Sequence, residues 1–159
     1  MSPRAAWRLE ALGFTDVADY VGGKADWLAS GLPREGETTS VAYAGELADC
    51  DPPVCGPDQN LADVHSLVEA SPYGFCVVVN EQRIVLGRLR KSAIEGAEPS
   101  SRVENLMEPG PSTVRPNTPA RELIDRLAGK GLTSAIVTTP AGRLYGVFSR
   151  SQAQRRLDG

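Results

Sequence analysis

The chain has 159 residues, of which 41% are hydrophobic, so it is long enough for one ordinary domain or two small ones with a buried core. Its 17 basic and 20 acidic side chains are mixed along the chain and give a net charge of −3, which disfavours nucleic acid as a partner. No apolar run approaches the roughly 20 residues that cross a bilayer, and the start lacks the apolar stretch of a signal peptide. We therefore expect a cytoplasmic protein that makes no membrane contact.

Cysteine and histidine are too few and too scattered to predict a metal site. Cys50, Cys55 and Cys76 are an odd number without paired spacing, and His65 has no second ligand near it in sequence. Cys76 lies in an apolar run that predicts a buried strand, where a thiol behaves as a small hydrophobic group. The residues thus predict neither a metal ligand nor a catalytic residue.

The first predicted elements lie in residues 1–36. A helical apolar pattern over residues 4–14 ends at Gly13, residues 17–21 are typical of a strand, and residues 24–31 predict a second short helix. Residues 37–45 follow as an expected linker, within a stretch rich in Gly, Glu, Thr and Ser.

From residue 46 onward the chain contains one unit twice. A shift of 59 positions superimposes the two copies without a gap, as from residue 57 to residue 116. The pairs that coincide include Pro57 with Pro116, Val64 with Leu123, Val77 with Ile136 and Gly87 with Gly146. Prolines and glycines therefore recur at matching places, which indicates two copies of one structure.

Each copy carries the same series of signals, which predicts the order strand, helix, strand, strand, helix. The first copy has an extended piece at 53–55, a helix start at 58–60, strands at 74–79 and 84–89, and a helix at 91–94. The second has an extended piece at 112–114, a helix start at 117–119, strands at 134–138 and 144–148, and a helix at 151–157. The expected fold class is α+β.

Two such units, at residues 46–99 and 100–159, are expected to form one globule. A unit of about 55 residues is near the size at which a core of its own is only marginally stable. Burying the sheet of one copy against the sheet of the other therefore stabilises both. The pair then has pseudo-twofold symmetry, and ligand sites fall in the clefts between the copies.

Two motifs of the second copy resemble those of cystathionine-β-synthase (CBS) domains. Residues 107–117 open the copy with the sequence MEPGPSTVRPN, and residues 146–152 end its hairpin with GVFSRSQ. The resemblance to a CBS pair covers residues 46–158. It implies a regulatory, non-catalytic module that binds an adenine-containing ligand such as AMP, ATP or S-adenosylmethionine and forms a homodimer.

The resemblance also implies site residues. In the family, a Ser or Thr three residues after the last strand's glycine helps to hold phosphate or ribose, and an acid three residues further grips the ribose. Ser149 matches the hydroxyl, but Gln152 replaces the acid, and the first copy has Arg90 and Ala93 at these two positions. The expected ligand site comprises Thr113, Val114, Thr133, Ser134, Ala135, Gly146, Phe148, Ser149, Arg150 and Gln152. The weaker first-copy site comprises Val54, Gly74, Phe75, Cys76, Gly87 and Arg90.

Residues 1–36 resemble the C-terminal part of a rhodanese domain through SPRAA, LGF, GG, Trp27 and GLP. A rhodanese transfers sulfur through a loop cysteine that would precede Ser2, whereas the first cysteine here is Cys50. Sulfur transfer by Cys50 or Cys55 is the competing enzyme hypothesis, which the missing loop disfavours. A third alternative is a structural dimerisation pair that has lost ligand binding, and the departures at Ala93 and Gln152 favour it.

Overall fold

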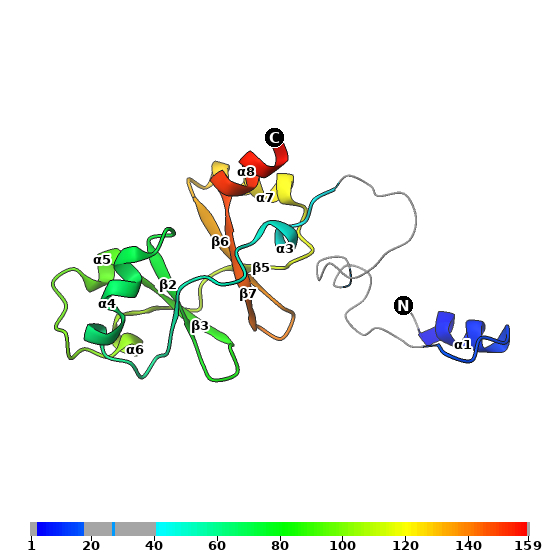
Figure 1. Cartoon of the computed structure of the whole chain (residues 1–159), viewed down its shortest axis with the longest axis horizontal. Helices are drawn as coiled ribbons and strands as arrows, with labels where there is room; N and C mark the ends of the chain where they lie inside the picture. The colour runs from blue at the N-terminus through cyan, green and yellow to red at the C-terminus, as the bar shows by residue number, and fades with distance from the viewer. Residues whose placement is uncertain (1–2, 18–26, 28–40, 159) are drawn as a thin grey trace.

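The computed structural model describes residues 3–17, 27 and 41–158 (Figure 1). Helix α1, Pro3–Ala11, lies where the helical pattern predicts it, and Gly13 follows it with φ 94°, a conformation that favours glycine. Most of the strand predicted at 17–21, most of the helix predicted at 24–31 and residues 37–40 of the expected linker fall outside the described residues. Among those described, no helix is long and apolar enough to cross a membrane.

The two copies fold into similar units, each with a mixed sheet covered by helices (Figure 1). The first unit contains β1 Val54–Cys55, α4 Leu61–Ala70, β2 Phe75–Val79, β3 Val85–Arg90 and α5 Lys91–Ile94. The second contains β5 Thr113–Val114, α7 Ala120–Gly129, β6 Ser134–Thr138, β7 Leu144–Ser149 and α8 Arg150–Asp158. In both units the first strand runs parallel to the second, and the second and third form an antiparallel hairpin. The predicted element order is confirmed.

Amphipathic helices cover the sheets as their apolar spacing predicts. Leu123 and Leu127 of α7 are buried at the spacing of one helical turn, and Val64 and Val68 are their counterparts in α4. Charged residues of α7 such as Glu122 remain exposed. Each helix therefore presents one apolar stripe to the core of its unit.

Three short elements are absent from the sequence-based description: α3 Ala44–Leu47, α6 Val103–Leu106 and β4 Glu108–Pro109. The backbone N–H of Ala44 donates to the carbonyl of Thr118, and that of Val103 donates to the carbonyl of Gln59, at 2.8 and 2.9 Å. The two bonds are related by the same shift of 59 positions. Each unit is therefore preceded by a short arm that packs on the other unit. The first arm is α3 with the residues that follow it to Asp49, and the second is α6 with β4.

Each arm contributes a residue to the core of the other unit. Ala44 is fully buried in the core of the second unit, whereas Val103 is fully buried in the core of the first. Strand β4 also extends the first sheet, because it pairs with β3. The expected boundaries, a linker at 37–45 and units at 46–99 and 100–159, stay a prediction. The arms add that a repeat in sequence does not say on which copy an arm packs.

The two sheets meet in a central cluster made by Phe75 and Val77 of β2 with Ile136, Leu144 and Val147 of the second unit. At one edge, the backbone N–H of Val85 donates to Gly142, and that of Leu144 donates to Arg83, at 3.1 and 2.8 Å. The same shift of 59 positions relates these two hydrogen bonds. The units are thus joined by a shared apolar layer and by a symmetric pair of backbone contacts.

Candidate functional site

A cavity of about 400 Å³ opens beside strands β5 and β6 of the second unit, and we call it the open pocket. Its walls come from β5, β6, helix α7 and the chain after β4, with a contribution from the first unit's sheet. The lining residues are Phe75, Arg88, Glu108, Gly110, Pro111, Ser112, Thr113, Val114, Leu123, Arg126, Leu127, Lys130, Leu132, Ser134, Ala135 and Ile136. The volume lies in the range of roughly 300–1,000 Å³ that small-molecule sites occupy.

Four of the expected ligand-binding residues lie in this lining: Thr113, Val114, Ser134 and Ala135. They come together because β5 and β6 pair in parallel, with Thr113 opposite Ile136 and Val114 opposite Val137. Phe75, expected in the weaker first-copy site, also faces the open pocket. The pocket therefore combines both repeats, as expected for a cleft between copies.

The other polar residues expected at the site lie outside this lining. The Ser149 hydroxyl oxygen is 3.3 Å from that of Ser151, and the backbone N–H of Arg150 donates to the Thr133 carbonyl at 2.9 Å. Gln152 is exposed on α8. A role for Thr133, Ser149, Arg150 and Gln152 in binding stays a prediction.

Gly146, Phe148 and Gly87 have packing roles in the structure. A Cβ at Gly146 would overlap the Asp49 carbonyl, and a Cβ at Gly87 would lie 2.9 Å from the Glu108 carbonyl. Phe148 is fully buried in the second core. The two glycines let the arms approach the sheets, a requirement that the sequence does not distinguish from ligand contact.

Most remaining residues of the weaker site are also structural. Cys76 is fully buried in the first core, and Val54 packs against the central cluster. Gly74 has φ 74°, and its carbonyl accepts the backbone N–H of Lys91 at 3.1 Å. Arg90, by contrast, belongs to a charged network beside the open pocket.

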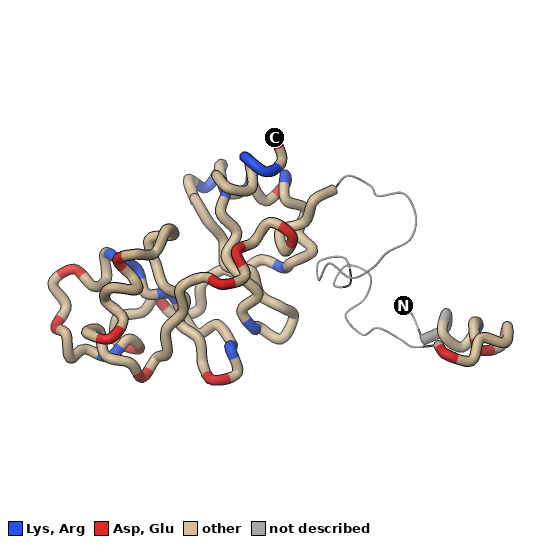
Figure 2. The backbone as a smooth tube through the Cα atoms, in the orientation of Figure 1, with Lys and Arg blue, Asp and Glu red and all other residues tan. Residues whose placement is uncertain are grey.

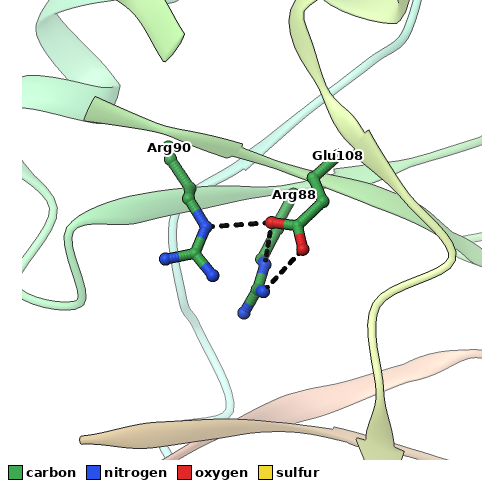
Figure 3. A network of polar contacts seen from close by, with 3 residues as sticks. All are labelled: Arg88, Arg90 and Glu108. Carbon is green, nitrogen blue, oxygen red and sulfur yellow. Dashed lines mark hydrogen bonds and ion pairs between the residues drawn. The ribbon is translucent and has the colours of Figure 1, made fainter. Parts of the chain in front are cut away.

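That network joins Arg88, Arg90 and Glu108 (Figure 3). Arg88 donates to both oxygens of Glu108, from Nε to Oε2 at 2.8 Å and from Nη2 to Oε1 at 2.9 Å. Arg90 Nε donates to the same Oε2 at 2.9 Å. The hydrogen bonds from Arg88, then those from Arg90, lower the pKa of Glu108 to about 2, so the carboxylate stays charged near neutral pH.

Arg126 and Lys130 were not singled out from the sequence as site residues. Both are exposed, lie four residues apart along α7 and its end, and line the open pocket. Within the described part of the chain, neither forms an ion pair. Basic and acidic residues are spread over both units (Figure 2), so this pair is distinguished by its place in the cavity rather than by a charged surface.

Strand β5 is held in place by a chain of polar contacts. Arg115 Nη1 donates to Oγ1 of the buried Thr138 at 3.1 Å, and also to the carbonyls of Thr138 and Thr139. Thr138 Oγ1 in turn donates to Thr113 Oγ1 at 3.0 Å. Because the Thr113 oxygen accepts in this chain, its own O–H remains available as a donor toward the pocket.

The corresponding place in the first unit has different chemistry. Tyr73 and Asp49 occupy the positions of Leu132 and Glu108, and the Tyr73 hydroxyl donates to Asp49 Oδ2 at 2.6 Å. Burial first, and then Asp49, raise the pKa of Tyr73 well above its usual value. The Tyr73 ring also contacts Phe75, with centroids 6.1 Å apart. The two repeats therefore present unequal clefts.

The open pocket has the features of a binding site for an anion that carries an apolar group. Val114, Leu132 and Ile136 supply an apolar wall, whereas Arg126 and Lys130 supply positive charge. Among the described residues, no group of three His, Cys, Asp or Glu side chains converges as a metal site.

Comparison with known proteins identifies the fold of the second unit. Residues 103–159 match the family model of the CBS domain. Over 124 residues the chain is 27% identical to the GMP reductase of Mycobacterium tuberculosis, an alignment that covers 78% of this chain and 26% of the reductase. The chain thus spans about a quarter of the length of that relative.

Solved structures extend the comparison to both units. The cytosolic domain of the Mg²⁺ channel MgtE in complex with ATP is 21% identical, with a TM-score of 0.63 over 72% of this chain and 48% of that one. The CBS domain pair of protein MJ0100, in complex with 5′-methylthioadenosine and S-adenosyl-L-methionine, is 12% identical, with a TM-score of 0.62 over 75% of this chain and 98% of that one. The chain has the α+β fold of a CBS domain pair, as the sequence predicts.

Proposed function

We propose that this chain, whose fold is that of a CBS pair, is a regulatory module that senses an adenine nucleotide in the open pocket. The observation that carries the proposal is that Thr113, Val114, Ser134 and Ala135, expected to bind the ligand, line the same cavity as two cations without ion-pair partners among the described residues. Similar folds were solved with ATP, and with 5′-methylthioadenosine and S-adenosyl-L-methionine. Adenine joined to a ribose ring is the group common to these ligands.

The base fits the apolar side of the cavity. Val114 and Ile136 offer aliphatic surface, and Phe75 offers an aromatic ring of the kind on which a base packs. The Thr113 hydroxyl and the Ser134 side chain add polar groups that orient a ligand in an otherwise apolar pocket. These contacts favour the adenine and ribose of the nucleotide.

Phosphate groups fit the α7 side. Arg126 and Lys130 approach the cavity from one helix face, and charge-assisted hydrogen bonds to phosphate are stronger than neutral ones. Arg88 also lines the cavity, although Glu108 already engages it. We therefore expect a nucleotide to bind more tightly than the corresponding nucleoside.

The proposal assigns binding rather than catalysis to this chain. Ligand binding shifts the relative placement of the two units, or of two chains in a homodimer, and a regulated partner responds to that shift. Sedimentation velocity tests the dimer. An apparent monomer across micromolar concentrations contradicts that part of the proposal.

Isothermal titration of the chain with AMP, ATP, adenosine and S-adenosylmethionine tests the binding. Saturable binding of ATP near one site per chain is expected, weakened by about tenfold or more in the double variant Arg126→Ala/Lys130→Ala. Adenosine binding changes little in that variant, because adenosine carries no phosphate. Arg121→Ala is the matched control, since Arg121 lies on the same helix but outside this pocket.

The competing function is a structural dimerisation pair that has lost its ligand. Gln152 and Ala93 stand where the family has an acid, and Tyr73 is bonded to Asp49 in the first unit, so both observations favour this second function. No heat with any of the four compounds, together with a stable dimer, overturns the sensor and supports the structural role.

A further inference from the structure

The two repeats place the same backbone around two clefts but fill them differently. In the second unit, Leu132 and Glu108 line the open pocket. A shift of 59 positions carries these residues to Tyr73 and Asp49, whose side chains are hydrogen bonded at 2.6 Å. The contact therefore spans the first-unit counterpart of the open pocket.

The carboxylates behave differently because their strand neighbours differ. Glu108 is engaged by Arg88 and Arg90, which hold it against strand β3 (Figure 3). The residues equivalent to these arginines are Val147 and Ser149, neither of which is a cation. Asp49 is instead engaged by the Tyr73 hydroxyl.

The first-unit cleft also lacks the positive charge of the open pocket. Leu67 and Ser71 stand where the second unit has Arg126 and Lys130, and Ser71 is buried, with its hydroxyl donating to the Phe75 carbonyl. The Tyr73 ring packs against Phe75, which belongs to the central cluster. An aromatic ring with a hydrogen-bonded hydroxyl thus stands at the position equivalent to that of Leu132 in the open pocket.

We propose that Tyr73 and Asp49 close the first-unit cleft, so that the chain takes up a single nucleotide, and that the residue at positions 73 and 132 decides which cleft is open. Tyr73 and Leu132 are then specificity-determining residues of the pair. The part that concerns the nucleotide rests on the proposed function. Closure of the cleft itself is a property of the protein alone and is tested without ligand.

Cysteine labelling tests the closure. Cys76 is equivalent to Ala135, which lines the open pocket, yet Cys76 is fully buried. Tyr73→Leu, which installs the residue of the second unit, is expected to raise the alkylation rate of Cys76 by about tenfold or more, because the cleft becomes accessible. Peptide mass spectrometry reads this signal separately from those of the exposed Cys50 and the buried Cys55.

The reciprocal variants keep the test decisive if Tyr73→Leu does not fold. Ala135→Cys is expected to label readily in the otherwise unchanged chain, and adding Leu132→Tyr is expected to slow that labelling by about tenfold. The closure is overturned if Cys76 stays protected in folded Tyr73→Leu, or if the thiol introduced by Ala135→Cys is already protected before Leu132→Tyr is added. Circular dichroism checks the fold of each variant.

Nucleotide titration then tests the consequence for binding. Unchanged chain is expected to bind one ATP, and Leu132→Tyr is expected to weaken that binding by about tenfold or more. Two ATP per unchanged chain, or unchanged affinity in Leu132→Tyr, overturns the single-site proposal. If the unchanged chain binds no nucleotide, the proposed function fails, whereas the labelling rates still decide whether Tyr73 closes the cleft.

Discussion

Gly146 and Gly87 hold the same position in the two repeats, and each has an arm of the chain pressed against it. A Cβ at Gly146 would overlap the backbone carbonyl of Asp49, which cannot move as a flexible side chain can. Gly146→Ala is therefore expected to lower the free energy of unfolding by about 1–3 kcal/mol, the usual cost of overpacking. Urea denaturation measures the change.

Gly129 provides the matched control for that substitution. It lies at the end of α7, and no atom approaches the place of its Cβ within 4 Å. Gly129→Ala is expected to leave the stability unchanged or to raise it by up to about 1 kcal/mol, because alanine loses less backbone freedom on folding. If Gly146→Ala were no more destabilising than Gly129→Ala, the close approach of the arm would carry no energetic weight.

Glu108 predicts a pH dependence of stability. Its pKa in the folded chain is lowered to about 2 from the ordinary 4.5, so its contribution to folding is fully present above about pH 4.5 and is lost as the pH falls toward 2. The stability difference between the unchanged chain and Glu108→Gln is expected to be constant near neutral pH and to shrink through this range. Urea denaturation at a series of pH values measures it.

The exposure of this ion pair sets a second expectation. The Glu108 side chain is 49% exposed, so added salt screens its attraction to Arg88 and Arg90. The stability difference between the unchanged chain and Glu108→Gln is therefore expected to narrow at high ionic strength. A difference that persists below pH 2, or that salt leaves unchanged, would mean that Glu108 acts through packing of β4 rather than through its charge.

Single residues differ in how well sequence predicts their roles. Thr113 and Ser134 were expected at the site because the second copy resembles a CBS domain, and the open pocket contains them. Arg126 and Lys130 were missed because they lie on the polar side of an amphipathic helix, a pattern equally typical of a solvated face. Their position in the pocket depends on how the helix lies against β6, which is tertiary information.

The longer elements were predicted well because they carry enough periodicity to show their type. Helix α7 and strands β6 and β7 lie within one or two residues of the expected bounds. Helices α3 and α6 have four residues each, which is too short for an apolar period to repeat. Even a correct helix assignment there would not have indicated the crossed packing, in which α3 packs on the second unit and α6 on the first. The unit on which each helix packs depends on contacts between residues far apart in sequence.

Crossed packing of α3 leads to a prediction about which unit a substitution disturbs. Ala44 lies next to the first unit in sequence but is fully buried in the second core. Ala44→Glu places an unpaired charge there and is expected to cost at least about 3 kcal/mol. Hydrogen exchange should show a larger loss of protection in α7 and α8, through local opening, than in α4 and α5.

Ala128→Glu is the control for this experiment, because Ala128 is exposed on α7 and its substitution buries no charge. It is expected to leave exchange in both units close to that of the unchanged chain. A larger loss of protection in α4 and α5 than in α7 and α8 in Ala44→Glu would contradict the crossed assignment of the arm.

The paired architecture of the whole molecule was predicted because the repeat spans most of the chain and each unit alone is marginal in size. The sequence also predicts a weaker first-copy site, from Arg90 and Ala93, but the repeat does not show which side chains fill the two clefts. That asymmetry depends on a few side chains, above all Tyr73 and the arginines that engage Glu108. An expected symmetric fold therefore carries asymmetric chemistry.

The two units are expected to unfold as one. Both arms cross between them, and the central cluster buries Ile136 against Phe75 and Val77, so neither core is complete without the other unit. Ile136→Ala is expected to destabilise both units together by about 2–5 kcal/mol. Calorimetry should show one unfolding transition, with equal van't Hoff and calorimetric enthalpies, in the unchanged chain and in Ile136→Ala. Two separate transitions, with only that of the second unit shifted by Ile136→Ala, would mean that the arms and the central cluster do not couple the units.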